Sequence, residues 1–103
     1  MVTHMEGLRF EWDLEKARSN LRKHGVSFET AIRVFSDPFA LTEQDRVEGN
    51  EYRWQTVGVI EGMLVLLVAH ADREEGGFDV IRIISARRAT TRERRRYAEN
   101  RSV

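Results

Sequence analysis

The residues best suited to chemistry in this sequence are arginines near its C-terminal end, one histidine and one tyrosine. Residues 81–103 contain eight arginines, no lysine and two acidic side chains. His24 directly follows Lys23, and Tyr97 lies among the arginines. Arginine forks bind phosphate or carboxylate in a bidentate way, so a cluster made of arginine alone favours an anionic ligand. A solvated helix of arginine–glutamate pairs is the alternative interpretation.

Such a set of side chains can cleave RNA without a metal ion. The 2′-hydroxyl of RNA is an internal nucleophile, so a protein needs to hold it in line, to move protons and to stabilise the charge that builds on the phosphate. No cysteine is present, the three histidines are far apart, and the sequence has neither a glycine-rich phosphate loop nor a nucleophile elbow. We therefore expect no metal and no cofactor.

Charge is distributed unevenly along the chain. Residues 81–103 carry a surplus of six positive charges, whereas residues 1–80 contain nine basic and fifteen acidic side chains, so the net charge is zero. This asymmetry indicates a polyanion or an acidic partner at the C-terminal end. The alternative function is therefore a non-catalytic module that binds nucleic acid or an acidic partner through the basic C-terminal helix.

Hydrophobic periodicity and capping residues predict the elements that position these side chains. Asp13 and Ser27 are N-caps, Gly25 suits a helix end, and Thr90 with Glu93 has the spacing of a capping box. We expect, in chain order, a strand at residues 8–12, helices at 14–24 and 28–36, strands at 53–60, 63–71 and 80–86, and a helix from Thr91. Residues 1–7 are predicted to be a loose leader, and the polar residues 42–50 a loop.

These elements predict a single α+β domain over residues 1–103. It consists of a strand, two helices, an antiparallel sheet of three to four strands and a basic C-terminal helix. The longest apolar run, Met63–Ala69, is far shorter than the roughly 20 residues that span a bilayer, and the sequence starts without a signal-peptide pattern. We expect a cytoplasmic protein with no membrane partner.

Two blocks of sequence carry a family resemblance. They read KHGV-F-E-A from Lys23 to Ala31 and RIISAR-A-E-Y from Arg82 to Tyr97. Five further residues match the same pattern: Lys16, Asn20, Arg53, Trp54 and Gly58. The chain resembles the BrnT toxins, which are the ribonuclease halves of bacterial type II toxin–antitoxin pairs. The resemblance implies a RelE-like fold, an RNA substrate and a ribbon-helix-helix antitoxin of the BrnA type that also binds operator DNA.

The function that we predict is a metal-independent endoribonuclease toxin that acts on messenger RNA. Arg53, Arg82 and Arg87 are assigned to the phosphate, and His24 and Tyr97 to proton transfer. Other cations are expected to contact RNA: Lys16, Lys23, Arg88, Arg92 and Arg95.

Each catalytic assignment has a structural alternative. His24 lies at a helix C-terminus, where the helix dipole favours a cation, and Tyr97 could pack the last helix onto the sheet. Arg82 lies inside an apolar strand and must reach a partner or a cleft, because an unpaired buried charge is costly. Arg87 ends that strand, so Arg87→Ala is expected to reduce cleavage and to leave stability almost unchanged. If Arg87 instead anchors the last helix, the substitution lowers the melting temperature.

Overall fold

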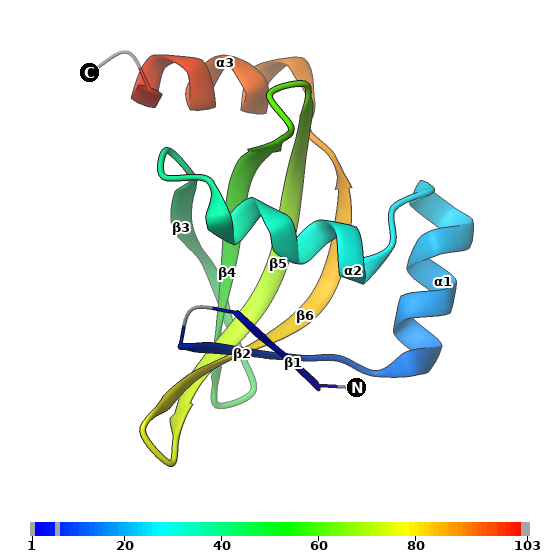
Figure 1. The fold of residues 1–103 in the computed structure, drawn as a ribbon, viewed down its shortest axis with the longest axis vertical. Coiled ribbons are helices and arrows are strands. Elements are labelled where there is room, and N and C mark those ends of the chain that lie inside the picture. The colour runs from blue at the N-terminus through cyan, green and yellow to red at the C-terminus, as the bar shows by residue number, and fades with distance from the viewer. Residues whose placement is uncertain (1, 6, 102–103) are drawn as a thin grey trace.

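The computed structural model describes residues 2–5 and 7–101. The described residues form one six-stranded sheet of order β1-β2-β6-β5-β4-β3, three α-helices and a 3₁₀ helix (Figure 1). The strands are β1 (Val2–Met5), β2 (Leu8–Glu11), β3 (Leu41–Glu48), β4 (Glu51–Ile60), β5 (Leu64–Glu75) and β6 (Phe78–Arg88). The helices are α1 (Leu14–His24), α2 (Phe28–Ala31), the 3₁₀ helix η1 (Ile32–Ser36) and α3 (Thr91–Arg101).

The α+β class is confirmed, and the predicted antiparallel meander is present as the four strands β3 to β6, but β1 and β2 extend the sheet to six strands and make it mixed. Strand β2 pairs in parallel with β6, because the chain between them crosses over through the helices and the other strands. Strand β1 lies within residues 1–7, which were expected to be a loose leader, and it pairs with β2. Met1 and Glu6 of that segment lie outside the described residues. Strand β3 replaces the loop predicted at residues 42–50.

Strand β3 was missed for a physical reason. Its side chains are exposed on both faces from Thr42 to Glu48, so the strand lacks the apolar alternation by which strands are found in a sequence. It lies at the edge of the sheet and is held by its antiparallel pairing with β4. Backbone hydrogen bonds to a neighbouring strand therefore define β3, and these leave no pattern in the sequence.

The helix ends form as the capping residues predict. The Asp13 carboxylate accepts hydrogen bonds from the N–H groups of residues 15 and 16, at 2.7 and 3.2 Å, and Gly25 adopts φ 70° after α1. Ser27 caps α2. That helix is shorter than predicted, because its second half continues as the 3₁₀ helix η1. The predicted capping box is confirmed: Thr90 Oγ1 accepts from Glu93 N, and Glu93 Oε1 accepts from Thr90 N.

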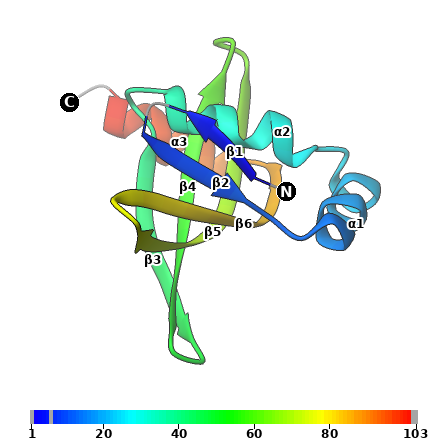
Figure 2. The same cartoon turned by 60° about the horizontal axis from the view of Figure 1, so that its bottom comes forward.

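Helices α2 and η1 cross one face of the sheet (Figures 1 and 2). The main core lies between them and the strands, and its largest members include Phe10, Phe28, Leu66 and Ile83. Gly58 of β4 allows this contact, because a Cβ added there would lie 2.9 Å from Val34 Cβ of η1. The same face holds His70, which is buried between Asp72 and Thr56, at 2.5 and 2.7 Å, and behaves as a core histidine.

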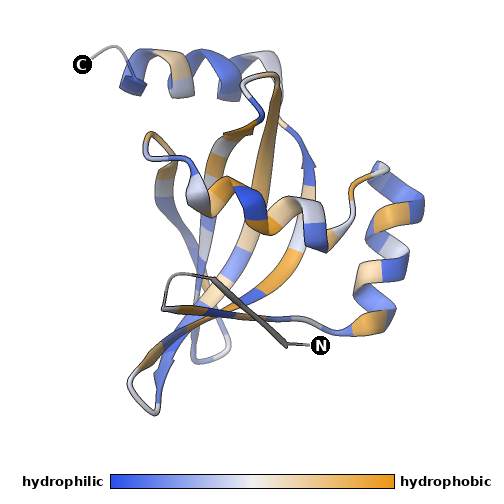
Figure 3. Cartoon of the chain, in the orientation of Figure 1, coloured by the Kyte–Doolittle hydropathy of each residue, from blue (hydrophilic) through white to orange (hydrophobic). Residues whose placement is uncertain are grey.

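Helix α3 lies across one end of the sheet and contacts the opposite face through a second, smaller cluster (Figure 1). The buried members of this cluster are Val57, Leu67, Ala89 and Tyr97. The rest of α3 is almost entirely hydrophilic (Figure 3). None of the helices in residues 2–5 and 7–101 has the length and apolar character that a membrane span requires.

Helix α1 packs against the part of β6 that β2 does not reach. Strand β2 pairs only with residues 79–82 of β6, so the following backbone of β6 has no strand on that side. The buried carboxamide of Asn20 takes the place of a strand there. Its Nδ2 donates to Ala86 O at 2.8 Å, and its Oδ1 accepts from Ala86 N at 3.0 Å. One side chain thereby satisfies both polar groups of a buried residue and fixes α1 beside β6.

Candidate functional site

The predicted phosphate arginines lie on the face of the sheet that α2 and η1 do not cover. Residues paired across neighbouring strands point to the same face, and the register pairs Arg53 with Ala71 and Ala71 with Arg82. We call this surface the open face and define it by three rows of paired residues. The rows are Arg53–Ala71–Arg82, Gln55–Ala69–Ser85 and Val57–Leu67–Arg87.

A β-bulge brings Arg82 and Arg87 onto this one face. Side chains alternate along a strand, so two residues five positions apart would normally point to opposite faces. The pairing of β5 with β6 shifts between Ala69 and His70, which leaves Ile84 as one extra residue on β6. Arg82 then pairs with Ala71 and Arg87 with Leu67, which share a face. The bulge therefore gathers three arginines around a floor that includes two alanines.

Arg53 and Arg82 meet at a single carboxylate, that of Glu51. Arg82 Nη2 donates to Glu51 Oε1 at 2.6 Å, and Arg53 Nε lies 3.3 Å from the same oxygen. The side chain of Arg53 is the more buried of the two, with 19% exposed against 36% for Arg82. Two guanidinium groups from different strands are thus held beside one anionic oxygen, and a phosphate would need the same arrangement.

Arg87 is tied to helix α3. Its Nη1 and Nη2 donate to the two carboxylate oxygens of Glu93 at 2.8 and 3.0 Å. The hydrogen bonds from Arg87 lower the pKa of Glu93 to about 2, against the opposing effect of burial, and Glu93 in turn raises the pKa of Arg87. This bidentate pair favours the alternative in which Arg87 anchors the last helix over the expectation that it matters little for stability, because the pair links β6 to the capping box of α3.

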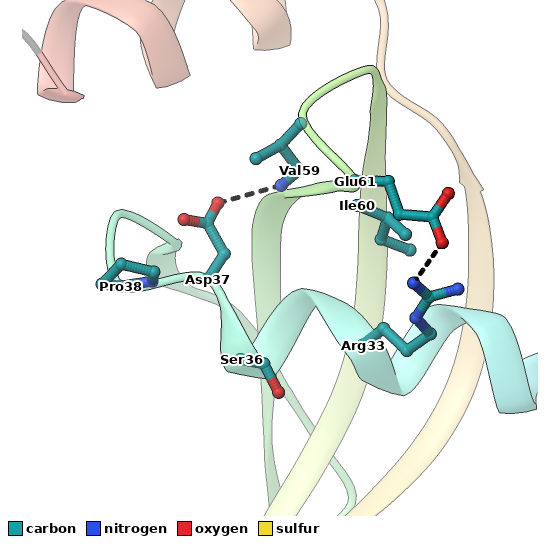
Figure 4. Close-up of a pocket in the computed structure, with 7 residues that line it drawn as sticks. All are labelled: Arg33, Ser36, Asp37, Pro38, Val59, Ile60 and Glu61. Carbon is teal, nitrogen blue, oxygen red and sulfur yellow. Dashed lines mark hydrogen bonds and ion pairs between the residues drawn. The ribbon is translucent and has the colours of Figure 1, made fainter.

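Tyr97 also joins α3 to the rest of the molecule. It is 4% exposed, and its hydroxyl donates to Asp37 Oδ2 at 2.5 Å. The same carboxylate oxygen accepts from Val59 N at 2.9 Å, near the C-terminal end of β4 (Figure 4). Burial and the bond to Asp37 raise the pKa of Tyr97 to about 12. Burial alone would raise the pKa of Asp37, but the hydrogen bonds from Tyr97, Val59 N and Phe39 N lower it.

His24 lies at another part of the surface, beside two of the predicted RNA-binding lysines. A cavity of about 270 Å³ between α1 and β6 is lined by seven residues: Lys16, Ser19, Asn20, Lys23, His24, Ile84 and Ser85. Ser85 also belongs to the middle row of the open face. The structure therefore brings Lys16, Lys23 and His24 together at the β6 edge of that face, and Ser85 connects the two surfaces.

The remaining predicted cations are more scattered. Arg88 is exposed and pairs with Leu66, a core residue, so its place in the register is on the face opposite to Arg87. Arg92 and Arg95 are exposed on α3 and, three residues apart, lie on neighbouring positions of one side of the helix. Within the described part of the chain, no contact joins His24 or Tyr97 to the pair formed by Arg53 and Arg82.

Sequence reasoning missed three residues of this site. Glu51 lies between the loop predicted at 42–50 and the strand predicted from Arg53, Asp37 is predicted only as a helix stop, and Ser85 enters only as part of a sequence block. The spacing of Glu51 and Arg53, two apart, would have placed them on one face had the strand been extended to residue 51. The contacts of Asp37 with residues 59 and 97 have no local signal.

No three histidine, aspartate or glutamate side chains among residues 2–5 and 7–101 gather as ligands for a metal ion.

One comparison with known proteins shows a family, and another shows the fold. The model of the family described as "Ribonuclease toxin, BrnT, of type II toxin-antitoxin system" matches residues 12–93. The crystal structure of the Brucella abortus ribonuclease toxin BrnT has the same fold, with a TM-score of 0.57 at 22% sequence identity, over 80% of this chain and 96% of that one. A search of curated proteins gives no match.

Proposed function

The chain belongs to the BrnT family of ribonuclease toxins of type II toxin–antitoxin systems, and we propose that it is a metal-independent endoribonuclease that cuts messenger RNA on the open face of its sheet. A toxin of this type implies an RNA substrate and an antitoxin partner. The observation that carries the proposal is the convergence of Arg53 and Arg82 across Ala71 at one anionic oxygen. Such a pair is placed to hold a backbone phosphate.

The chemistry needs no group beyond RNA and protein. The 2′-oxygen attacks the adjacent phosphorus, so an O2′–P bond forms and the P–O5′ bond breaks. The proton of the 2′-hydroxyl passes to a base, and an acid supplies a proton to the leaving 5′-oxygen. The products are a 2′,3′-cyclic phosphate and a 5′-hydroxyl. The negative charge on the phosphate oxygens peaks at the transition state, where fixed guanidinium groups stabilise it most.

The residues divide into those that face RNA and those that hold the site. Arg53 and Arg82 bind the scissile phosphate, and His24 is the candidate for proton transfer, since one nitrogen of a neutral imidazole accepts a proton while the other donates one. We assign Tyr97 to support, because its buried hydroxyl donates to Asp37 and a pKa of about 12 suits it poorly to proton transfer at neutral pH. Arg87 adds charge to the open face, but both of its terminal nitrogens are engaged by Glu93.

The surrounding cations extend the surface that RNA contacts. Lys16 and Lys23 line the cavity beside Ser85 and can bind phosphates upstream or downstream of the cut. Exposed Arg92 and Arg95 continue the positive charge along α3. We assign Arg88 a weaker contact, because its register places it on the other face.

The test is cleavage of a labelled RNA by purified protein. We expect cutting that persists in EDTA, that requires a 2′-hydroxyl and therefore spares DNA of the same sequence, and that is lost in Arg82→Ala. Parallel reactions with and without ribosomes show whether free or translated RNA is the substrate. Cutting that stops in EDTA would contradict the metal-independent mechanism, and RNA that is bound and never cut would favour the non-catalytic module.

We propose further that the antitoxin is a ribbon-helix-helix protein of the BrnA type, which also binds operator DNA, and that free toxin inhibits translation and growth. The basic, exposed surface of α3 supports an acidic partner surface. Expression of this chain alone should arrest growth, and co-expression with the neighbouring reading frame should relieve the arrest and give a co-eluting complex. Two proteins that never co-elute would contradict this assignment. The RelE-like relationship remains a prediction.

A further inference from the structure

Glu51 occupies the position that a phosphate would take on the open face. It is the first residue of β4, directly after the turn that connects β3 to β4. Its Oε1 lies 2.6 Å from Arg82 Nη2 and 3.3 Å from Arg53 Nε. Side chains two apart on a strand share a face, so Glu51 and Arg53 point the same way. One carboxylate oxygen of the protein itself thus bridges the two arginines assigned to the substrate.

The fit of this carboxylate is incomplete. Among the described residues, the buried Nε–H of Arg53 has no hydrogen-bond partner, although Glu51 Oε1 is only 3.3 Å away, so the two groups are not aligned. A buried donor that lacks an acceptor destabilises a protein. An anion with two oxygens could bridge the same guanidinium groups with better alignment. The orphaned donor points to a ligand that Glu51 imitates only in part.

We infer that Glu51 is an internal substitute for the RNA phosphate: its carboxylate holds Arg53 and Arg82 in position in the free protein, and a backbone phosphate displaces it when RNA binds. This inference rests on the proposed function. It assigns the scissile phosphate to the Arg53–Arg82 pair and gives Glu51 the role of a positioning residue that also competes with substrate.

The Glu51 carboxylate can leave its position beside the two arginines. The Glu51 side chain is 35% exposed, and β3, its neighbour, is exposed from Thr42 to Glu48. An ion pair at this degree of exposure contributes little to stability, so RNA contacts elsewhere on the basic surface can drive the exchange. Glu93 differs, because its carboxylate also accepts the Thr90 N–H of the α3 capping box and cannot leave without uncapping the helix.

The experiment compares Glu51→Gln with a matched control, Glu48→Gln. The amide keeps the size of Glu51 and a hydrogen-bond acceptor but removes the charge. Glu48 pairs with Glu51 across the same hairpin, yet its own ion pair is with Arg46, at 3.1 Å. We expect Glu51→Gln to tighten binding of a non-cleavable 2′-O-methyl RNA by roughly 3–10-fold at low salt, and Glu48→Gln to change it less than about 2-fold.

Kinetics and a double variant complete the test. For cleavable RNA, Glu51→Gln should lower KM by more than it changes kcat. In Glu51→Gln/Arg82→Ala, the dissociation constant should equal that of Arg82→Ala alone, because Glu51 has lost its main partner. Melting curves confirm that every variant is folded.

The outcomes separate this inference from the proposed function. If Arg82→Ala weakens binding and cleavage while Glu51→Gln resembles the wild type, the substitute role is wrong and the proposed function stands. A fall in kcat with unchanged KM in Glu51→Gln would also overturn the inference, because Glu51 would then take part in proton transfer. If Arg82→Ala affects neither binding nor cleavage, the open face is not the site, and both proposals fail.

Discussion

The two ends of the open face carry arginine–glutamate groups that differ in how the glutamate is held. At one end, Glu51 contacts Arg53 and Arg82 from an exposed hairpin. At the other, Glu93 accepts both terminal nitrogens of Arg87 and the backbone N–H of Thr90. The second group is reinforced by the Tyr97–Asp37 hydrogen bond, which fastens α3 to the turn after η1.

Arginine–carboxylate pairs of similar length can therefore have opposite roles. A pair built into a capped helix and a buried cluster is part of the fold, and replacing its carboxylate by a ligand would break other bonds. A pair whose carboxylate comes from an exposed hairpin and makes no further bonds to the fold can exchange it for a ligand. On the proposed function, the arginines of α3 are therefore mainly a support and a charged surface, whereas the phosphate site comes from Arg53 and Arg82 on two different strands.

Arg82→Ala should have the largest effect of all substitutions in these two arginine–glutamate groups. We expect cleavage to fall about 10²–10³-fold, as when a fixed charge-stabilising donor is removed, with the free energy of unfolding lowered by less than about 1 kcal/mol. The matched control is Arg33→Ala, which breaks an exposed pair with Glu61 at the opposite face and should leave cleavage unchanged. Initial rates and urea midpoints on the same samples measure both effects, and equal rates in the two variants would refute the assignment.

Arg87→Ala should show the reverse pattern. Loss of the bidentate pair should lower the free energy of unfolding by about 1–2 kcal/mol, while cleavage per folded molecule falls less than in Arg82→Ala. Arg87→Lys should restore part of the stability, since an ammonium keeps the charge but loses the fork. Unchanged melting with a loss of cleavage as large as that of Arg82→Ala would return Arg87 to the phosphate.

Tyr97→Phe tests the hydrogen bond to Asp37, the second contact that holds α3 to the rest of the protein. It removes the hydroxyl that donates to Asp37 and keeps the ring in its cluster, so we expect a loss of about 1 kcal/mol of stability. Cleavage per folded molecule should stay near the wild-type rate. A fall of cleavage larger than tenfold at full folding would show instead that Tyr97 transfers a proton.

The Glu93 and Tyr97 contacts should each add a small dependence of stability on pH, one in acid and the other in alkali. The pKa of Glu93 is lowered from 4.5 to about 2, so its contribution is complete above pH 4.5 and is lost as the pH falls toward 2. The pKa of Tyr97 is raised from 10.0 to about 12, so its contribution is present below pH 10 and is lost as the pH rises toward 12. Urea titrations at a series of pH values should show that the free energy of unfolding falls less in acid in Glu93→Gln than in the wild type, and that it falls less in alkali in Tyr97→Phe.

The local features of this fold could be read from the sequence. Asp13, Ser27 and the Thr90–Glu93 capping box placed three helix starts, because each cap bonds to backbone only two or three residues away. The hairpin that joins two apolar strands at Glu61 and Gly62, both with positive φ, was also predicted, but its loop has three residues, 61–63, instead of two, because Ile60 pairs with Leu64. The family blocks around His24 and Arg82 also depended on short stretches of sequence.

Tertiary structure alone decided how the site is assembled. The parallel pairing of β2 with β6, the pairing of β3 with β4 and the bulge at Ile84 depend on which strands become neighbours, and a period-two pattern would have placed Arg82 and Arg87 on opposite faces. The Tyr97–Asp37 bond joins residues 60 positions apart, and the Glu51–Arg82 bond spans 31. Such contacts leave no local pattern, because each partner acquires its role only when the folded sheet brings it to the other.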